Sequence, residues 1–127
     1  MRQMVYTSVA TSQMDQADVF TIVQTSVSNN MARDVTGFLI YGDGRFLQLI
    51  EGTGDDLRGL MTTLKADPRH RDITVLVDEP VTERKFSRWR MQRVTRDGEA
   101  MGEIRRTLAG ATTGRAALRE IDRFLAH

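Results

Sequence analysis

Apolar and polar positions follow one another along the chain in patterns that predict strands and helices in a definite order. Residues 2–9 are rich in strand formers, and Gly42-Asp43-Gly44 joins two further strand segments into a hairpin. Apolar residues spaced by three and four between Leu57 and Leu64 predict one stripe on a helix. The predicted elements are a strand at 2–9, a helix that opens at Ser12 and runs to about Ser28, strands at 35–41 and 44–52, a helix at 55–66, strands at 73–77 and 86–94, and helices at 99–108 and 115–126.

This order predicts an α+β fold on the ferredoxin-like plan, βαββαββ, with two helices on one face of the sheet. We expect the first strand to be central and to run parallel to the second strand of the hairpin. The other face would be left open, so two further helices at the C-terminal end are candidates to cover it, or to cover a partner. We therefore predict a domain at 1–96 and a helical extension for output or oligomerisation at 97–127.

Gln48 interrupts the most apolar strand of the chain, between Leu47 and Leu49. Such a continuous apolar run is typical of a strand that is buried on both faces. A buried carboxamide without partners costs roughly 1–3 kcal/mol, so a protein or ligand partner is expected. From spacing alone, a core glutamine bonded to a backbone group is the simpler interpretation.

Tyr6 of the first strand could meet Gln48 in the folded chain. A buried tyrosine usually finds a single hydrogen-bond partner and has no further role. The pair Asn29-Asn30 ends the first predicted helix and could serve only as its C-cap. Together, however, a phenol and carboxamides form an uncharged set of donors and acceptors that suits the edge of a flat heterocycle better than hydrolysis.

Two other groups of residues allow more than one interpretation. Trp89 and Met91 are spaced by two, which places them on one face of the last predicted strand, where ordinary packing would explain both. Arg69-His70-Arg71 could be a solvated turn, or a basic edge that binds a phosphate or carbonyl oxygen.

Composition removes several classes of chemistry. The chain has 18 basic and 17 acidic side chains, which gives no strong field for nucleic acid or anionic membranes. It has no cysteine and two histidines, which excludes disulfides and thiol adducts and disfavours a histidine metal site. No apolar run approaches the length of a membrane span or a signal peptide, so we expect a cytoplasmic protein.

Six motifs together resemble the BLUF family of blue-light sensors that use flavin, over about residues 3–94. They are Met4-Val5-Tyr6-Thr7-Ser8, Asn29-Asn30, the segments 35–41 and 44–52, Asp67-Pro68-Arg69-His70 and Trp89-Arg90-Met91. The resemblance implies the ferredoxin-like sheet with a flavin standing between the two helices.

By the same resemblance, Tyr6 gives an electron to the excited flavin, and Gln48 lies between the tyrosine hydroxyl and the N5 and O4 edge of the ring. Light would change the orientation or tautomer of Gln48 and shift the flavin absorption to the red. The remaining predicted cofactor contacts are Asn30 at the pyrimidine edge, Asn29, Arg69 and His70 in support, and Ile22 and Leu64 on either side of the ring. Trp89 and Met91 would carry the signal out.

The leading hypothesis is a short, stand-alone, non-enzymatic photoreceptor that binds FAD noncovalently, with FMN or riboflavin as alternatives, and signals to a separate effector protein. We also expect a homo-oligomer. The alternatives are a flavin-free interaction module and a small enzyme of the acyl-phosphate hydrolase type. The hydrolase would need an anion-binding loop after the first strand, and residues 10–13 contain no glycine to form one.

Overall fold

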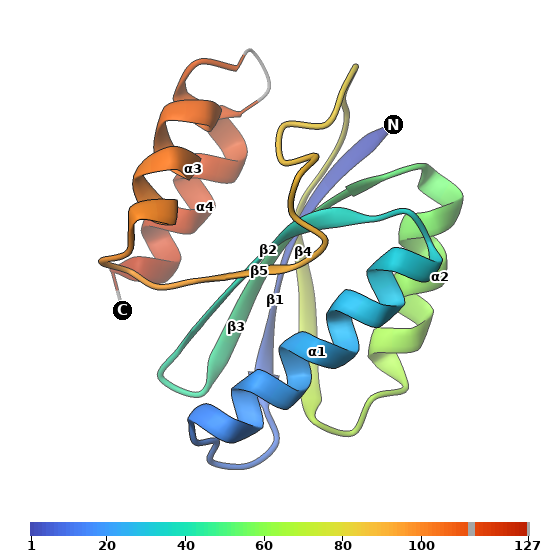
Figure 1. The fold of residues 1–127 in the computed structure, drawn as a ribbon, viewed down its shortest axis with the longest axis vertical. Coiled ribbons are helices and arrows are strands. Elements are labelled where there is room, and N and C mark those ends of the chain that lie inside the picture. The colour runs from blue at the N-terminus through green and yellow to red at the C-terminus, as the bar shows by residue number, and fades with distance from the viewer. Residues whose placement is uncertain (112–113, 127) are drawn as a thin grey trace.

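The computed structural model describes residues 1–111 and 114–126. The predicted extension at 97–127 therefore includes three residues outside the described part. Helices and strands follow the predicted order (Figure 1), and their bounds are β1 Arg2–Ala10, α1 Gln16–Ala32, β2 Thr36–Gly42, β3 Arg45–Gly52, α2 Gly54–Lys65, β4 His70–Pro80, β5 Gln92–Val94, α3 Glu99–Ala109 and α4 Arg115–Leu125.

The five strands form one sheet in the order β4-β1-β3-β2-β5. Only the short contact between β2 and β5 is parallel, and the other pairs are antiparallel. The ferredoxin-like α+β prediction is confirmed. The expected parallel pairing of β1 with β3 is wrong, because the crossover through α1 makes β1 parallel to β2, and β3 returns between them in the opposite direction.

Helices cover both faces of the sheet. Figure 1 shows α1 and α2 on one side and the α3–α4 hairpin on the other. Each side has its own core cluster. One cluster lies under α1 and α2, and the other joins residues of α3 and α4 to the sheet. The C-terminal helices thus cover the face that the sequence leaves open. This removes the uncovered sheet face as an argument for an oligomer, which remains a prediction.

The side chains of β3 alternate between these two clusters. Leu47 and Leu49 contribute to the cluster under α3 and α4, whereas Phe46 and Ile50 contribute to the cluster under α1 and α2. Every residue of β3 after Arg45 is buried. The prediction of a strand buried on both faces is confirmed, and Gln48 lies on the side of α1 and α2.

Both ends of α1 differ from the prediction. Asp15, not Ser12, is the N-cap, and it forms a capping box with Asp18. The helix continues through Asn29-Asn30 to Ala32 and stops before Asp34, which has φ 52°. The interpretation of Asn29 or Asn30 as the C-cap is therefore wrong.

The last predicted strand, 86–94, forms only in part. Residues 86–91 are irregular, and β5 contains only three residues. Backbone groups of this segment bond outside a regular ladder. The Trp89 carbonyl accepts from the Gly37 N–H at 2.7 Å, and the Phe86 N–H donates to the Glu51 carboxylate at 3.0 Å. These separate anchors replace the uniform pairing that a strand would need.

Glu51 anchors the connection from β4 to β5. Its carboxylate is fully buried and accepts from the Thr36 hydroxyl and from the N–H groups of Lys85 and Phe86. Arg84 donates to the Glu51 carbonyl and to the Thr36 hydroxyl. The connection thus returns to the middle of the sheet instead of lying free on the surface.

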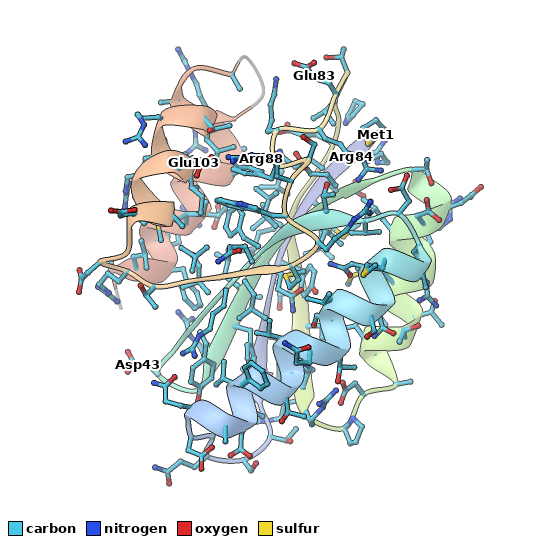
Figure 2. The ribbon with its side chains drawn as sticks, in the orientation of Figure 1. Met1, Asp43, Glu83, Arg84, Arg88 and Glu103 are labelled. Atoms are coloured by element: carbon cyan, nitrogen blue, oxygen red, sulfur yellow. The ribbon has the colours of Figure 1, made fainter. Side chains whose placement is uncertain are left out.

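The same connection contacts the C-terminal hairpin. Figure 2 shows Arg88 beside Glu103 of α3, with which it forms an ion pair. Within residues 1–111 and 114–126, none of the helices has the length and apolarity needed to cross a membrane.

Candidate functional site

Tyr6 of β1 and Gln48 of β3 lie directly opposite each other in the antiparallel pair. Opposite residues point to the same face, with Cβ atoms about 4.5–5.5 Å apart. Both residues are buried, at 1% and 2% exposure. Among the described residues, neither the phenol nor the carboxamide forms a hydrogen bond with another protein group.

A pocket lies above this pair, between α1 and α2, and its empty space is about 360 Å³ when the open solvent at its mouth is included. The sheet supplies Tyr6 and Gln48, and the two helices and the turn after α2 supply the walls. All eight predicted cofactor-binding residues line it: Tyr6, Ile22, Asn29, Asn30, Gln48, Leu64, Arg69 and His70. The structure thus brings the set together, while the role of each residue remains a prediction.

Asn30 is the pocket residue with the most informative hydrogen bonding. It is fully buried, and its Nδ2 donates to the Arg90 carbonyl at 2.6 Å. Its Oδ1 is buried and has no hydrogen-bond partner in the protein. A buried acceptor without a donor is costly, so this oxygen suits a ligand that presents an N–H group.

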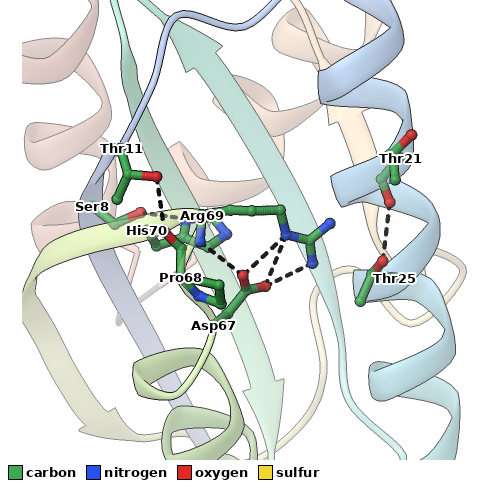
Figure 3. Close-up of polar contacts among 8 residues, drawn as sticks. All are labelled: Ser8, Thr11, Thr21, Thr25, Asp67, Pro68, Arg69 and His70. Atoms are coloured by element: carbon green, nitrogen blue, oxygen red, sulfur yellow. Dashed lines mark hydrogen bonds and ion pairs between the residues drawn. The ribbon is translucent and has the colours of Figure 1, made fainter.

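The pocket has little free charge. Burial raises the pKa of the Tyr6 phenol above its usual value of 10.0, so the phenol stays protonated. The Arg69 guanidinium forms an ion pair with Asp67 at 2.6 Å, and hydrogen bonds from Arg69 lower the pKa of that carboxyl. Figure 3 shows Arg69 reaching towards α1 while its guanidinium remains paired with Asp67.

His70 closes the pocket at the start of β4. Its Nδ1 lies 3.1 Å from the Ser8 hydroxyl, and its ring packs against Phe46 with 4.8 Å between ring centroids. Burial is the main cause that lowers the His70 pKa below its usual 6.5, with Asp67 acting in the opposite direction. The imidazole is therefore neutral at neutral pH and offers the site a polar wall without charge.

Trp89 and Met91 do not share a face, contrary to the prediction from their spacing. Trp89 packs against the cluster under α3 and α4 and stacks on Phe86 at 5.4 Å between centroids. Met91 is buried in the cluster under α1 and α2, with Tyr6. The residues fall on opposite sides because their segment is irregular, so strand alternation does not apply there.

Five further pocket residues were not among the predicted contacts: Thr25, Ser26, Leu60, Thr63 and Asp67. Thr25 and Ser26 lie one helical turn from Ile22 and Asn29, so the periodicity of α1 could have found them. Thr63 accepts from Arg33 across the two helices at 2.9 Å. That contact joins residues 30 positions apart and leaves no local signal in the sequence.

The loop after β1 gives no support to an acyl-phosphate hydrolase. Its Thr11 N–H donates to the Arg69 carbonyl, and the Thr11 hydroxyl donates to the Pro68 carbonyl at 2.8 Å (Figure 3). These donors are occupied by the turn before β4 and do not converge on an anion site.

The residues fit a flavin ring. A flat heterocycle with N–H and carbonyl groups matches the uncharged phenol and carboxamides, and Asn30 Oδ1 offers an acceptor that the protein leaves unpartnered. Ile22 and Leu64 add apolar contact from the two facing helices. Nothing in this donor set requires a metal, and no cluster of three metal-binding side chains occurs among the described residues.

Solved structures of similar fold include a BLUF protein and a protein solved with FMN. BlrB, a BLUF protein in its dark state, is 28% identical with a TM-score of 0.72, and the match covers 98% of this chain and 94% of BlrB. Klebsiella pneumoniae BlrP1, solved with FMN and cyclic diGMP, is 27% identical with a TM-score of 0.78, and the match covers 98% of this chain and 34% of BlrP1.

Sequence comparison reaches the same family. The photoactivated adenylate cyclase subunit beta of Euglena gracilis is 33% identical over 93 residues, which are 72% of this chain and 11% of that protein. The chain thus spans about a tenth of the length of this curated relative. The model of the BLUF family, described as sensors of blue light using FAD, matches residues 1–92. The chain therefore belongs to the BLUF family and contains its flavin-dependent blue-light sensor domain.

Proposed function

We propose that this chain binds flavin noncovalently in the pocket between α1 and α2, and that light changes the hydrogen bonds of Gln48 and Tyr6. One observation carries the proposal: Tyr6 and Gln48 are opposite each other, buried, and line the same pocket. A bound flavin would supply the absorption of blue light and an electron acceptor for the Tyr6 phenol.

The protein groups have separate tasks in this proposal. The Tyr6 phenol is kept protonated by burial, so it can donate a hydrogen bond and release a proton only when it is oxidised. The Gln48 carboxamide has a donor end and an acceptor end, and reorientation or tautomerisation exchanges them. Its environment in β3 is otherwise apolar, so its orientation follows the few polar groups in the pocket.

The finer parts of the proposal concern the flavin form and the output. FAD is the proposed cofactor, with FMN and riboflavin as alternatives, because the predicted contacts are made to the ring that all three share. We propose a non-enzymatic sensor whose signal leaves through Trp89, Met91 and the α3–α4 hairpin towards a separate effector protein. The contact of Arg88 with Glu103 and the packing of Trp89 beneath α3 and α4 support this route.

An absorption spectrum taken in the dark and then under blue light tests the proposal. The purified chain, incubated in turn with riboflavin, FMN and FAD, should retain at least one of them through gel filtration. Blue light should then shift the flavin absorption reversibly to the red. Protein that retains none of the three would contradict flavin binding and favour the flavin-free interaction module. A bound flavin without a reversible shift would contradict the light-driven role of the site.

A further inference from the structure

Residues 89–91 connect the two layers of the protein at the edge of β2. Trp89 packs against the cluster under α3 and α4, and Met91 is buried in the cluster under α1 and α2. Arg90 lies between them, and its exposed side chain forms an ion pair with Asp34 at 3.0 Å. A shift of the Arg90 backbone would therefore disturb residues on both faces of the sheet.

The Asn30 side chain is hydrogen-bonded to the backbone of Arg90, the middle residue of this segment. The 2.6 Å bond from Asn30 Nδ2 to the Arg90 carbonyl spans 60 positions in the sequence. The other end of the same carboxamide, Oδ1, is buried without a partner, and the residue lines the pocket. One planar group thus belongs to the lining of the pocket and also holds the output segment through its Nδ2.

We propose that Asn30 is a positioning residue that couples occupation of the pocket to the placement of Trp89 and Met91. The inference rests on the proposed flavin binding. With a flavin bound, Asn30 Oδ1 would accept a hydrogen bond from it, which would fix the plane of the carboxamide and keep Nδ2 on the Arg90 carbonyl. Because binding and segment position are linked, each stabilises the other. This route reaches Trp89 through the backbone, without a contact between Gln48 and Trp89.

Trp89 is the only tryptophan in the chain, so its fluorescence reports on this segment alone. The measurement is the bimolecular rate constant for acrylamide quenching, from Stern–Volmer slopes divided by the unquenched lifetime, which corrects for energy transfer to a flavin. Asn30→Ala removes the hydrogen bond to the Arg90 carbonyl. Asn29→Ala removes a neighbouring amide that lines the same pocket but has no bond to Arg90.

In flavin-free protein, Asn30→Ala should raise the quenching constant at least about twofold, because loss of the hydrogen bond to the Arg90 carbonyl increases local opening. Asn29→Ala should leave the constant unchanged. Riboflavin, at a concentration that titration shows to saturate each protein, should lower the constant in the wild type but not in Asn30→Ala. If the alanine variant fails to fold by circular dichroism, Asn30→Leu, which keeps most of the volume, takes its place.

If a folded Asn30 variant has the quenching constant of the wild type, the inference that Asn30 holds residues 89–91 is overturned. An unchanged wild-type constant at saturating riboflavin would overturn the coupling. Failure of riboflavin to bind the wild type would overturn the proposed function and with it the coupling, while the flavin-free comparison would still decide whether Asn30 holds the segment.

Discussion

Tyr6 and Gln48 are cross-strand partners at the centre of the sheet, and β1 and β3 hold them side by side beneath α1 and α2. Their proximity depends on the antiparallel register, since a shift of one residue would turn one side chain to the opposite face. The sheet thus fixes the positions of both backbones, while the polar ends of both side chains are left to the pocket. Such an arrangement allows hydrogen bonds to change without movement of the strands.

Removal of the phenol should abolish the light response without loss of the pocket. In Tyr6→Phe, we expect flavin to bind and the reversible red shift to disappear, because the electron and proton donor is gone. Difference absorption spectra before and after blue light measure this. Tyr41→Phe is the matched control, since Tyr41 is the other tyrosine, packs on Phe46 and does not line the pocket. A normal shift in Tyr6→Phe would contradict the assigned role.

Replacement of Gln48 by leucine should separate stability from function. The flavin-free protein should keep its free energy of unfolding to within about 1 kcal/mol, because the carboxamide lines the open pocket, where solvent can satisfy it. The red shift should be lost. Gln3→Leu is the control, because Gln3 is also buried with an unpartnered Oε1 but does not line the pocket, so it should keep the shift. Urea unfolding and difference spectra measure the two effects.

Acid should destabilise the flavin-free protein through His70. The folded-state pKa is lowered, mainly by burial, so below about pH 6.5 the unfolded chain binds a proton that the folded protein resists. The stabilising contribution is complete above pH 6.5 and is lost as the pH falls through the folded-state pKa. Asp34 and Asp67, with pKa values below the usual 3.8, stay charged at pH 5.5.

The measurement is urea unfolding at pH 7.5 and 5.5. His70→Asn, which can keep a hydrogen bond to Ser8, should show a smaller loss of stability between the two pH values than the wild type. An equal loss in both proteins would show that His70 does not control this window.

Glu51 should be far more sensitive to amidation than a surface carboxylate. In Glu51→Gln, one acceptor oxygen becomes an NH₂ group that faces backbone N–H donors of Lys85 or Phe86. We expect a loss of about 1–3 kcal/mol in the free energy of unfolding, because a buried donor loses its partner. Glu103→Gln, which breaks the surface ion pair with Arg88, should cost at most about 1 kcal/mol. Equal effects by urea unfolding would refute the anchoring role of Glu51.

Gly37 should tolerate no side chain. Its φ is 154°, and a Cβ there would lie 1.9 Å from the Leu49 carbonyl oxygen of β3. Gly37→Ala must displace β2 from β3, so we expect a loss of more than about 2 kcal/mol and a lower melting temperature. Gly42→Ala, in the same strand with open space around it, should change the melting temperature little. Calorimetry of the two variants tests the difference.

Periodicity in the sequence was sufficient for the parts of the fold where a regular backbone repeats. The continuous apolar run around Gln48 predicted a strand buried on both faces, and the stripe from Leu57 to Leu64 predicted the buried face of α2. These predictions hold because strand and helix geometry fix side-chain direction from local spacing alone. The site residues could be named because their motifs carry the family resemblance, and periodicity by itself left Gln48 as an ordinary core residue.

The tertiary structure decided what local spacing cannot express. The side chain of Asn30 does not end its helix but donates a hydrogen bond to the carbonyl of Arg90, 60 residues away. The faces of Trp89 and Met91 depend on anchors at Gly37 and Glu51 that prevent a regular strand. In such a segment, long-range hydrogen bonds rather than the two-residue repeat set the direction of each side chain. The sequence alone therefore determined the order of the helices and strands and the burial of β3. The folded chain determined the pairing of Tyr6 with Gln48, the covering of the second sheet face, and how the pocket and the output segment are joined.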